Sequence, residues 1–147
     1  SWMPSYGPEM RGGTANCITI VSDTTISSPI VSRFDTGILL NQPSMDKFES
    51  RIKPGGIIVY ESTNILHASE RTDIGIYAIA AADEANKLNN VRIANMILLG
   101  AFLQRKPIVS LDGIMEALKK VLPERYHNLL PVNRKALEVG AEIMSKM

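Results

Sequence analysis

Short apolar runs, rich in β-branched residues and separated by polar segments, dominate the first half of the chain. Most of them are bounded by turn residues, which is typical of strands. The run that begins at Ile57 has continuous apolar character, as expected for a strand covered on both faces of a sheet. We therefore predict four strands, over residues 15–23, 38–40, 57–62 and 74–80.

The segment between the second and third predicted strands carries helix and turn signals. Pro43 disfavours a helical conformation at Gln42, the residue before it. Ser44 is a good N-cap residue, so a short helix is predicted over residues 45–52. The sequence Lys-Pro-Gly-Gly at residues 53–56 predicts a turn that leads into the third strand.

After residue 91 the pattern changes to helices. Residues 91–106 are apolar on all sides, which predicts a buried central helix that ends before Pro107. Ser110 suits the N-cap of a helix over 111–122, in which apolar residues recur at helical spacing. Further helices are predicted over residues 82–90, 123–130 and 131–147.

Strands that alternate with helices predict an α/β fold: a mostly parallel sheet in a three-layer α/β/α sandwich, with a helical C-terminal part. No linker or internal repeat interrupts the pattern, so residues 1–147 are predicted to form one domain. Ligands bind such folds at the carboxyl ends of the strands. We expect the ligand-facing edge at residues 41–44, 61–64 and 80–84.

Composition narrows the classes of function. The 147 residues are 45% apolar and 21% charged, with a net charge of +1. This balance gives no reason to expect a nucleic acid or an anionic membrane as the partner. The longest apolar run, residues 93–102, is about half as long as a bilayer span. A cytoplasmic protein is expected.

Cys17 is the only cysteine. Its place in the run Asn-Cys-Ile-Thr-Ile-Val predicts a small buried hydrophobe. One thiol forms no internal disulfide and cannot by itself hold an iron–sulfur cluster or a structural zinc. His67 and His127 each lack a nearby His or Cys in the sequence. No metal site is therefore predicted.

The sequence predicts no catalytic residue. It has no G-x-S-x-G motif, and nothing selects one serine as a nucleophile. Three carboxylates, Glu61, Asp83 and Glu84, lie near predicted strand ends. Asp83 and Glu84 are adjacent and suit the first turn of a helix, where the helix dipole favours negative charge. We interpret all three carboxylates as structural.

The segment before the first predicted strand, SYGPEMRGGTANC (residues 5–17), is rich in permissive residues and hydrogen-bond donors. Gly12 and Gly13 precede a strand, so they do not form the dinucleotide-binding loop G-x-G-x-x-G, and no Walker motif occurs. Arg11 and the neighbouring backbone N–H groups could bind an anion or a carboxylate. A tight turn beside a surface arginine is the alternative.

Five segments carry a family resemblance: SYGPEMRGGTANC, NQPSMDKF, KPGGIIVYES, RIANMILLGAFL and SLDGIMEAL. They resemble the gamma subunit of 2-oxoacid:ferredoxin (acceptor) oxidoreductases, which is similar to the third domain of single-chain pyruvate:ferredoxin oxidoreductases. The resemblance runs from Ser1 to about Leu122. Members of this family usually begin with a strand, a G-x-G-G-Q-G loop and a helix before the S-Y-G-P segment. We therefore expect that the natural protein has residues upstream of Ser1 and that this sequence is N-terminally truncated.

The resemblance implies oxidative decarboxylation of a 2-oxoacid (2-oxoisovalerate, 2-oxoglutarate or pyruvate) with coenzyme A, giving acyl-CoA, carbon dioxide and reduced ferredoxin. It implies that thiamine diphosphate and iron–sulfur clusters are held by other subunits and that this chain binds none of the cofactors alone. The implied partners are alpha and beta subunits, with a delta subunit as a further candidate, and ferredoxin through the complex. The runner-up is a stand-alone α/β protein that binds a nucleotide or cofactor. A third interpretation is a purely structural subunit.

The resemblance also suggests which residues matter. Arg11 with the backbone of Gly12 and Gly13 is expected to hold a phosphate of coenzyme A or an acidic group of a neighbouring subunit. The expected interface and ligand-approach loop comprises Tyr6, Gly7, Pro8, Glu9, Arg11, Gly12, Gly13 and Thr14. The expected ligand-approach residues at the strand end are Asn41, Gln42, Pro43 and Ser44. Of these, Asn41, Gln42 and Ser44 are expected to offer hydrogen bonds to the same ligand.

Overall fold

A computed structural model of the chain describes residues 2–5, 15–28 and 30–147. Its strands are β1 (Trp2–Ser5), β2 (Asn16–Thr19), β3 (Phe34–Leu39), β4 (Ile52–Glu61) and β5 (Gly75–Ile79). Its α-helices are α1 (Gln42–Phe48), α2 (Ala81–Lys87), α3 (Ala94–Arg105), α4 (Leu111–Val121) and α5 (Leu130–Ser145). Short 3-10 helices lie at Glu49–Arg51, Val91–Ile93 and Glu124–Leu129.

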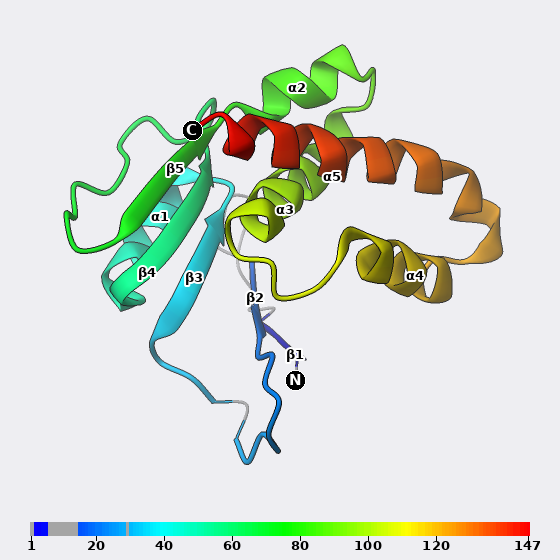
Figure 1. The fold of residues 1–147 in the computed structure, drawn as a ribbon. Coiled ribbons are helices and arrows are strands. Elements are labelled where there is room, and N and C mark those ends of the chain that lie inside the picture. Colours follow the sequence, from blue (N-terminus) through cyan, green and yellow to red (C-terminus); the bar gives the residue numbers. More distant parts are fainter. Residues whose placement is uncertain (1, 6–14, 29) are drawn as a thin grey trace.

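A parallel sheet in the order β3-β4-β5 forms the middle layer (Figure 1). Val59 of the central strand β4 lies opposite Ile38 of β3 and opposite Tyr77 of β5. Successive residues of a strand point to opposite faces. Val59 accordingly packs with residues of α3 and α5, whereas Ile58 packs with Met45 of α1. Both faces of the sheet are covered, so the predicted three-layer α/β/α arrangement is confirmed.

The larger part of the core lies between the sheet and the helices α3 and α5. Ile97 and Leu98 of α3 and Leu137 of α5 are fully buried there. The prediction of a buried central helix is thus confirmed over Ala94–Arg105. On the opposite face, Met45 and Ile52 belong to a smaller cluster beneath α1.

The first predicted strand differs most from its prediction. Instead of extending over residues 15–23, β2 covers only Asn16–Thr19 and pairs antiparallel with β1, in a hairpin separate from the parallel sheet. The prediction that Cys17 is buried was wrong, because its side chain is exposed on this hairpin. A β-branched run favours a strand, but it does not determine which sheet the strand joins.

Residues 53–56 lie inside β4 instead of forming a separate turn before it. They nevertheless interrupt the pairing: Phe34 opposes Ile52, whereas Thr36, two residues later, already opposes Ile57. Gly55 has a positive φ of 80°, which glycine adopts at no steric cost. The turn-forming residues therefore produce a bulge in the strand.

The remaining helical predictions agree with the structure to within a few residues. Ser110 caps α4 as predicted, and its side-chain oxygen accepts a hydrogen bond from the Gly113 backbone N–H at 3.0 Å. In the described ranges of the chain, no helix combines the length and the apolar character that crossing a membrane requires.

Candidate functional site

The predicted ligand-facing edge begins where β3 ends. Asn41 is extended (φ −148°, ψ 163°) and caps α1, because its side-chain Oδ1 accepts a hydrogen bond from the Ser44 backbone N–H at 3.0 Å. The predicted cap at Ser44 was therefore wrong, and Gln42 already belongs to the helix. Pro43 is tolerated in the first turn because the N–H that it lacks would have no partner within the helix.

The Gln42 side chain joins α1 to the loop that follows β4. Its Oε1 accepts hydrogen bonds from the backbone N–H groups of Leu66 and His67 at 3.1 and 2.9 Å. Its Nε2 donates to the His67 backbone oxygen at 2.8 Å and to Asp46 Oδ1 at 2.9 Å. A glutamine amide has two donor hydrogens and two acceptor lone pairs. All of them are used inside the chain, so Gln42 positions the loop rather than a ligand.

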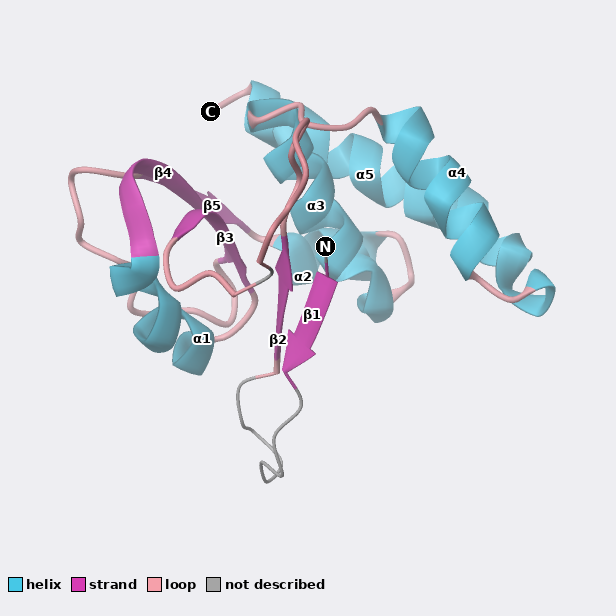
Figure 2. Ribbon diagram, turned by 90° about the horizontal axis from the view of Figure 1, so that it is seen from below, coloured by secondary structure: helices cyan, strands magenta, loops and turns pink. Residues whose placement is uncertain are grey.

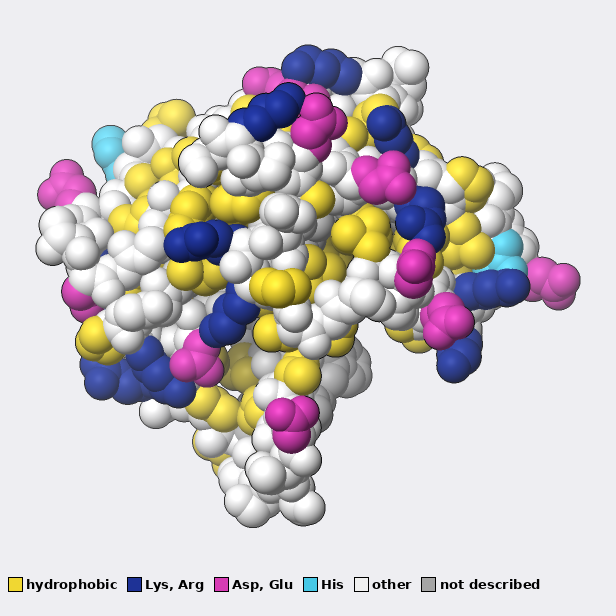
Figure 3. Space-filling view, in the orientation of Figure 1, with side chains coloured by type: hydrophobic (Ala, Val, Ile, Leu, Met, Phe, Trp, Pro, Cys, Tyr) yellow, Lys and Arg dark blue, Asp and Glu magenta, His cyan; other side chains and the backbone are white. Residues whose placement is uncertain are grey.

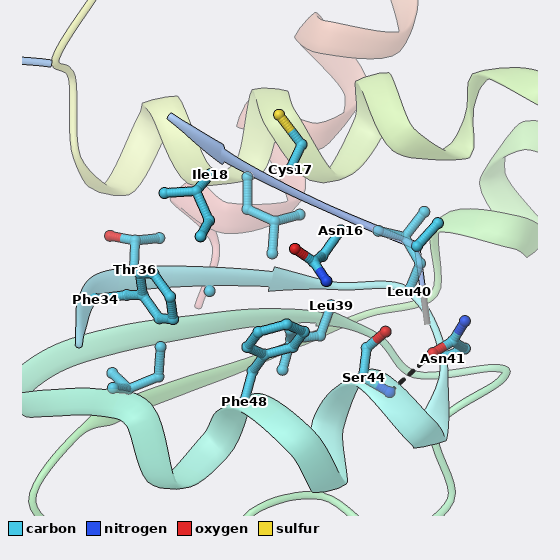
Figure 4. A pocket seen from close by; sticks show the side chains of 14 residues that line it. Asn16, Cys17, Ile18, Phe34, Thr36, Leu39, Leu40, Asn41, Ser44 and Phe48 are labelled. Atoms are coloured by element: carbon cyan, nitrogen blue, oxygen red, sulfur yellow. Dashed lines mark hydrogen bonds between the residues drawn. The ribbon is translucent and has the colours of Figure 1, made fainter. Parts of the chain in front are cut away.

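A pocket of about 460 Å³ lies beside this edge (Figure 4). Its wall is formed by the hairpin strand β2 on one side and by β3 and α1 on the other. Figure 4 shows the side chains of Asn16 and Ser44 directed into the space between β2 and α1. The lining residues are Ala15, Asn16, Cys17, Ile18, Phe34, Thr36, Gly37, Ile38, Leu39, Leu40, Asn41, Ser44, Phe48 and Ile52.

The chemistry of this pocket is neutral. Most of its described lining is aliphatic or aromatic, and the polar groups are amides, hydroxyls and one thiol. No charged side chain is among the described residues that line it. Such a surface suits an apolar group with a few hydrogen-bonding atoms, and it offers no cation to a phosphate.

Phe48 forms a fixed part of the pocket wall. Its ring and that of Phe34 form an edge-to-face contact, with 6.1 Å between the ring centroids. Lys47 and Arg51 place their cationic groups 5.4 and 5.7 Å from the Phe48 ring centroid. These contacts are favourable and orient the ring.

Glu61 lies at the carboxyl end of β4 and is buried. Its carboxylate accepts hydrogen bonds from the backbone N–H groups of Thr63 at 3.3 Å, Asn64 at 2.9 Å and Ala82 at 3.2 Å. It thereby ties the loop after β4 to the first turn of α2. These contacts support the structural interpretation of Glu61.

Asp83 and Glu84, the other two carboxylates interpreted as structural, are in the first turn of α2, as expected. Glu84 forms an ion pair of 2.6 Å with Lys87. This hydrogen bond raises the pKa of Lys87 above its ordinary value. Asp83 and Glu84 thus support the helix and do not face the pocket.

Arg71 also holds the loop after β4 in place, through four side-chain hydrogen bonds. Its Nη1 donates to the backbone oxygens of Glu49 and Ile52 at 2.6 and 2.8 Å. Its Nε and Nη2 donate to the two carboxylate oxygens of Asp73 at 2.9 and 2.6 Å. The hydrogen bonds from Arg71 hold the pKa of Asp73 below its ordinary value.

The two histidines lie apart from the pocket lining. His67 is exposed in the loop that Gln42 holds, and His127 Nε2 lies 3.0 Å from the Leu122 backbone oxygen. Among the described residues, no three His, Cys, Asp or Glu side chains cluster in a way that could hold a metal ion.

The predicted opening loop lies outside the described residues: Tyr6, Gly7, Pro8, Glu9, Arg11, Gly12, Gly13 and Thr14. Ala15, which follows this loop directly, lines the pocket, as do Asn41 and Ser44 of the predicted strand end. Sequence reasoning missed Asn16, Thr36 and the aromatic pair of Phe34 and Phe48. These residues meet only through packing of distant segments, which no local pattern indicates.

The chain was compared with known proteins. The model of the family described as "Pyruvate ferredoxin/flavodoxin oxidoreductase" matches residues 1–143. The chain is 35% identical over 144 residues to ketoisovalerate oxidoreductase subunit VorA of Methanothermobacter thermautotrophicus, covering 97% of this chain and 29% of that protein. It is 32% identical to 2-oxoglutarate synthase subunit KorC of Methanocaldococcus jannaschii, covering 95% of this chain and 76% of that protein. The chain thus spans less than a third of the length of the VorA protein.

Two solved structures share the fold. The gamma subunit of a keto/oxoacid ferredoxin oxidoreductase from Geobacter sulfurreducens has a TM-score of 0.78 and 26% identity, covering 100% of this chain and 80% of that one. The 2-oxoglutarate:ferredoxin oxidoreductase from Magnetococcus marinus has a TM-score of 0.82 at 20% identity, covering 99% of this chain and 26% of that one, and it supports the fold alone. The chain therefore belongs to the pyruvate ferredoxin/flavodoxin oxidoreductase family, and its resemblance to the gamma subunits of 2-oxoacid:ferredoxin oxidoreductases is confirmed.

Proposed function

We propose that this chain is the gamma-type component of a 2-oxoacid:ferredoxin oxidoreductase. The complex would convert a 2-oxoacid and coenzyme A to acyl-CoA and carbon dioxide and pass the electrons to ferredoxin. The family match over residues 1–143 carries this proposal. The structural likeness to a gamma subunit, which covers the whole chain, supports it.

The substrate is proposed to be 2-oxoisovalerate or 2-oxoglutarate, ahead of pyruvate. Two relatives named for ketoisovalerate are 35% and 32% identical to this chain. Relatives named for 2-oxoglutarate are between 25% and 32% identical, and pyruvate synthase subunit PorC of Methanothermobacter thermautotrophicus is 25% identical. These identities support the order of preference.

The catalytic cofactors are proposed to be held by other components of the complex. An iron–sulfur cluster needs several thiolates, and this sequence has one cysteine. The described pocket offers neutral groups and no cation for a diphosphate. One cysteine therefore does not fit a cluster, and the described lining of the pocket does not fit the diphosphate of thiamine diphosphate. The proposed partners are alpha and beta subunits, with a delta subunit as a further candidate, in a cytoplasmic complex that ferredoxin reaches.

The contribution of this chain is proposed to be shaping the approach to the active centre. Arg11 and the backbone of Gly12 and Gly13 would bind a phosphate of coenzyme A or an acidic group of a neighbouring subunit. Asn41 and Ser44 would line that approach, because both border the pocket next to the end of the opening loop. Gln42 and Pro43 would act indirectly, by fixing the start of α1 and the loop after β4.

The test is to isolate the complex through a tag on this chain and to assay reduction of a viologen dye. We expect coenzyme A-dependent reduction with one of 2-oxoisovalerate, 2-oxoglutarate and pyruvate, and no reduction when either the oxoacid or coenzyme A is omitted. A chain that is isolated alone, inactive and carrying a bound nucleotide would contradict the proposal and favour the stand-alone binding protein.

A further inference from the structure

The segment from β2 to the start of β3 projects from the body of the molecule (Figure 1). Figure 2 shows β2 beside β1, apart from β4 and β5. We call its described residues, 15–28 and 30–33, the arm. None of these residues is buried. Apolar side chains are among the most exposed: Val21 is 58% exposed and Ile30 is 79% exposed. The arm therefore presents apolar surface without a counterpart in the described part of the chain.

The arm carries little charge. Asp23 and Arg33, its last residue, are the only charged residues among its described positions, although 21% of the whole chain is charged. Figure 3 shows this contrast: the lower projection presents mostly white and yellow atoms, while dark blue and magenta side chains are spread over the sheet and the helices. Exposed strands of proteins that work alone are normally protected by charged residues. Loss of charge is instead typical of the centre of a protein–protein interface.

The hairpin needs support from outside the sheet. A two-stranded hairpin is at best marginally stable in water by itself. Here β2 pairs with β1 and with no other described strand. The pocket lies between β2 on one side and β3 and α1 on the other, so the sheet does not pack directly against the whole face of the hairpin. Cys17 and Thr19, which alternate along β2 with the half-buried Asn16 and Ile18, are exposed to solvent.

Longer relatives indicate what kind of polypeptide covers the arm. This chain corresponds to 29% of the VorA relative and to 26% of the Magnetococcus marinus chain. In those proteins the same region is joined to further polypeptide, which is available as its neighbour. We propose that the arm is a docking surface for a neutral, largely apolar face of another subunit or domain of the same oxidoreductase. This inference rests on the proposed function.

The test uses the chain co-expressed with the other oxidoreductase subunits of its source organism. Val21→Glu and Ile30→Glu place a charge where the interface would exclude water, and an unpaired buried charge is costly. We expect each variant to weaken association with those subunits about tenfold or more, which corresponds to about 1.4 kcal/mol. Both side chains are exposed in the chain itself, so its melting temperature should be unchanged.

Two controls separate docking from general effects. Val21→Thr keeps the shape of the side chain without adding charge, and it should retain wild-type association. Val121→Glu adds the same charge at a residue of α4 that is 78% exposed, and it should also retain association. If the two arm variants assemble as tightly as the wild type, the proposal is wrong.

Hydrogen–deuterium exchange gives an independent readout. The backbone amides of residues 16–21 should exchange about tenfold more slowly in the complex than in the isolated chain. Unchanged exchange in an active complex would overturn the docking proposal and leave the proposed function standing. Absence of oxidoreductase subunits and of 2-oxoacid activity in the wild type would overturn the proposed function itself. If the isolated chain dimerises and Val21→Glu makes it monomeric, the arm binds a second copy, and the proposal is wrong.

Discussion

Gly100 of α3 and Gly140 of α5 each face the backbone of the other helix at the point where the two helices cross. A Cβ atom at Gly100 would lie 2.0 Å from the Leu137 backbone oxygen, and one at Gly140 would lie 1.8 Å from the Ile97 backbone oxygen. Neither distance is compatible with a side chain. The two glycines thus permit the close approach of α3 and α5, on which the larger of the two core clusters depends.

Gly140→Ala is therefore expected to destabilise the chain. Alanine favours an isolated helix by about 1 kcal/mol over glycine, but here the clash is with backbone and can be relieved only by shifting a helix. We expect a net loss of about 2 kcal/mol in the free energy of unfolding, measured by urea denaturation. Gly113→Ala in α4 is the control, because its Cβ would approach only the Ser110 hydroxyl, at 3.1 Å. A neutral or stabilising Gly140→Ala would contradict the packing account.

Removing the Gln42 amide should loosen the loop after β4. Gln42→Ala leaves the Leu66 and His67 backbone N–H groups without their acceptor, although water can partly replace it in this exposed position. We expect a loss of about 1–2 kcal/mol in unfolding free energy and faster amide exchange at both residues. Asp46→Asn keeps an acceptor oxygen for Gln42 and should change little. Wild-type exchange at Leu66 and His67 in Gln42→Ala would show that other contacts hold the loop.

The pair of Arg71 and Asp73 predicts a pH dependence of stability. The pKa of Asp73 is lowered in the folded state, so the contribution of its carboxylate is fully present above the unfolded-state pKa of about 4. It is lost as the pH falls from there through the folded-state pKa. Asp73→Asn should accordingly show a smaller fall in melting temperature between pH 5 and pH 2 than the wild type, as followed by circular dichroism. Identical pH profiles would rule out this pair as a source of acid sensitivity.

Arg11 is predicted to act in the assembled enzyme rather than in folding. Arg11→Ala should raise the KM for coenzyme A in viologen reduction, because a guanidinium that binds a phosphate is lost. Arg125→Ala, at an exposed residue after α4, provides a matched loss of charge and should leave this KM unchanged. Unaltered kinetics of Arg11→Ala in an intact complex would remove Arg11 from the ligand approach.

The sequence predicted the layers of the fold better than the details of the site. Ser110 was correctly predicted as a cap because its signal is local: a hydroxyl placed before an apolar helical pattern. Asn41 was missed as the cap because Pro43 disfavours a helical conformation at Gln42, whereas the helix begins at Gln42. The burial of Cys17 could not be predicted from its neighbours, since it depends on which sheet β2 joins.

The pocket could not be predicted either, because it too depends on how distant segments pack together. Its wall combines residues from β2, β3 and α1 that are far apart in the sequence, such as Asn16 and Phe48. Gln42 is a polar residue at a strand end, but the sequence could not reveal that its amide is fully used by the loop after β4 and by Asp46 of α1. A polar residue at a strand end is therefore a weaker indication of ligand binding than a polar residue that also lines a pocket.

Reconstitution tests the central claim most directly. The other subunits of the oxidoreductase are prepared with and without this chain, and coenzyme A-dependent viologen reduction is measured with 2-oxoisovalerate, 2-oxoglutarate and pyruvate. We predict that adding this chain restores turnover with one of these oxoacids and that the preparation without it is at least about tenfold slower. Equal turnover in the two preparations would contradict the claim that this chain is a working component of the enzyme.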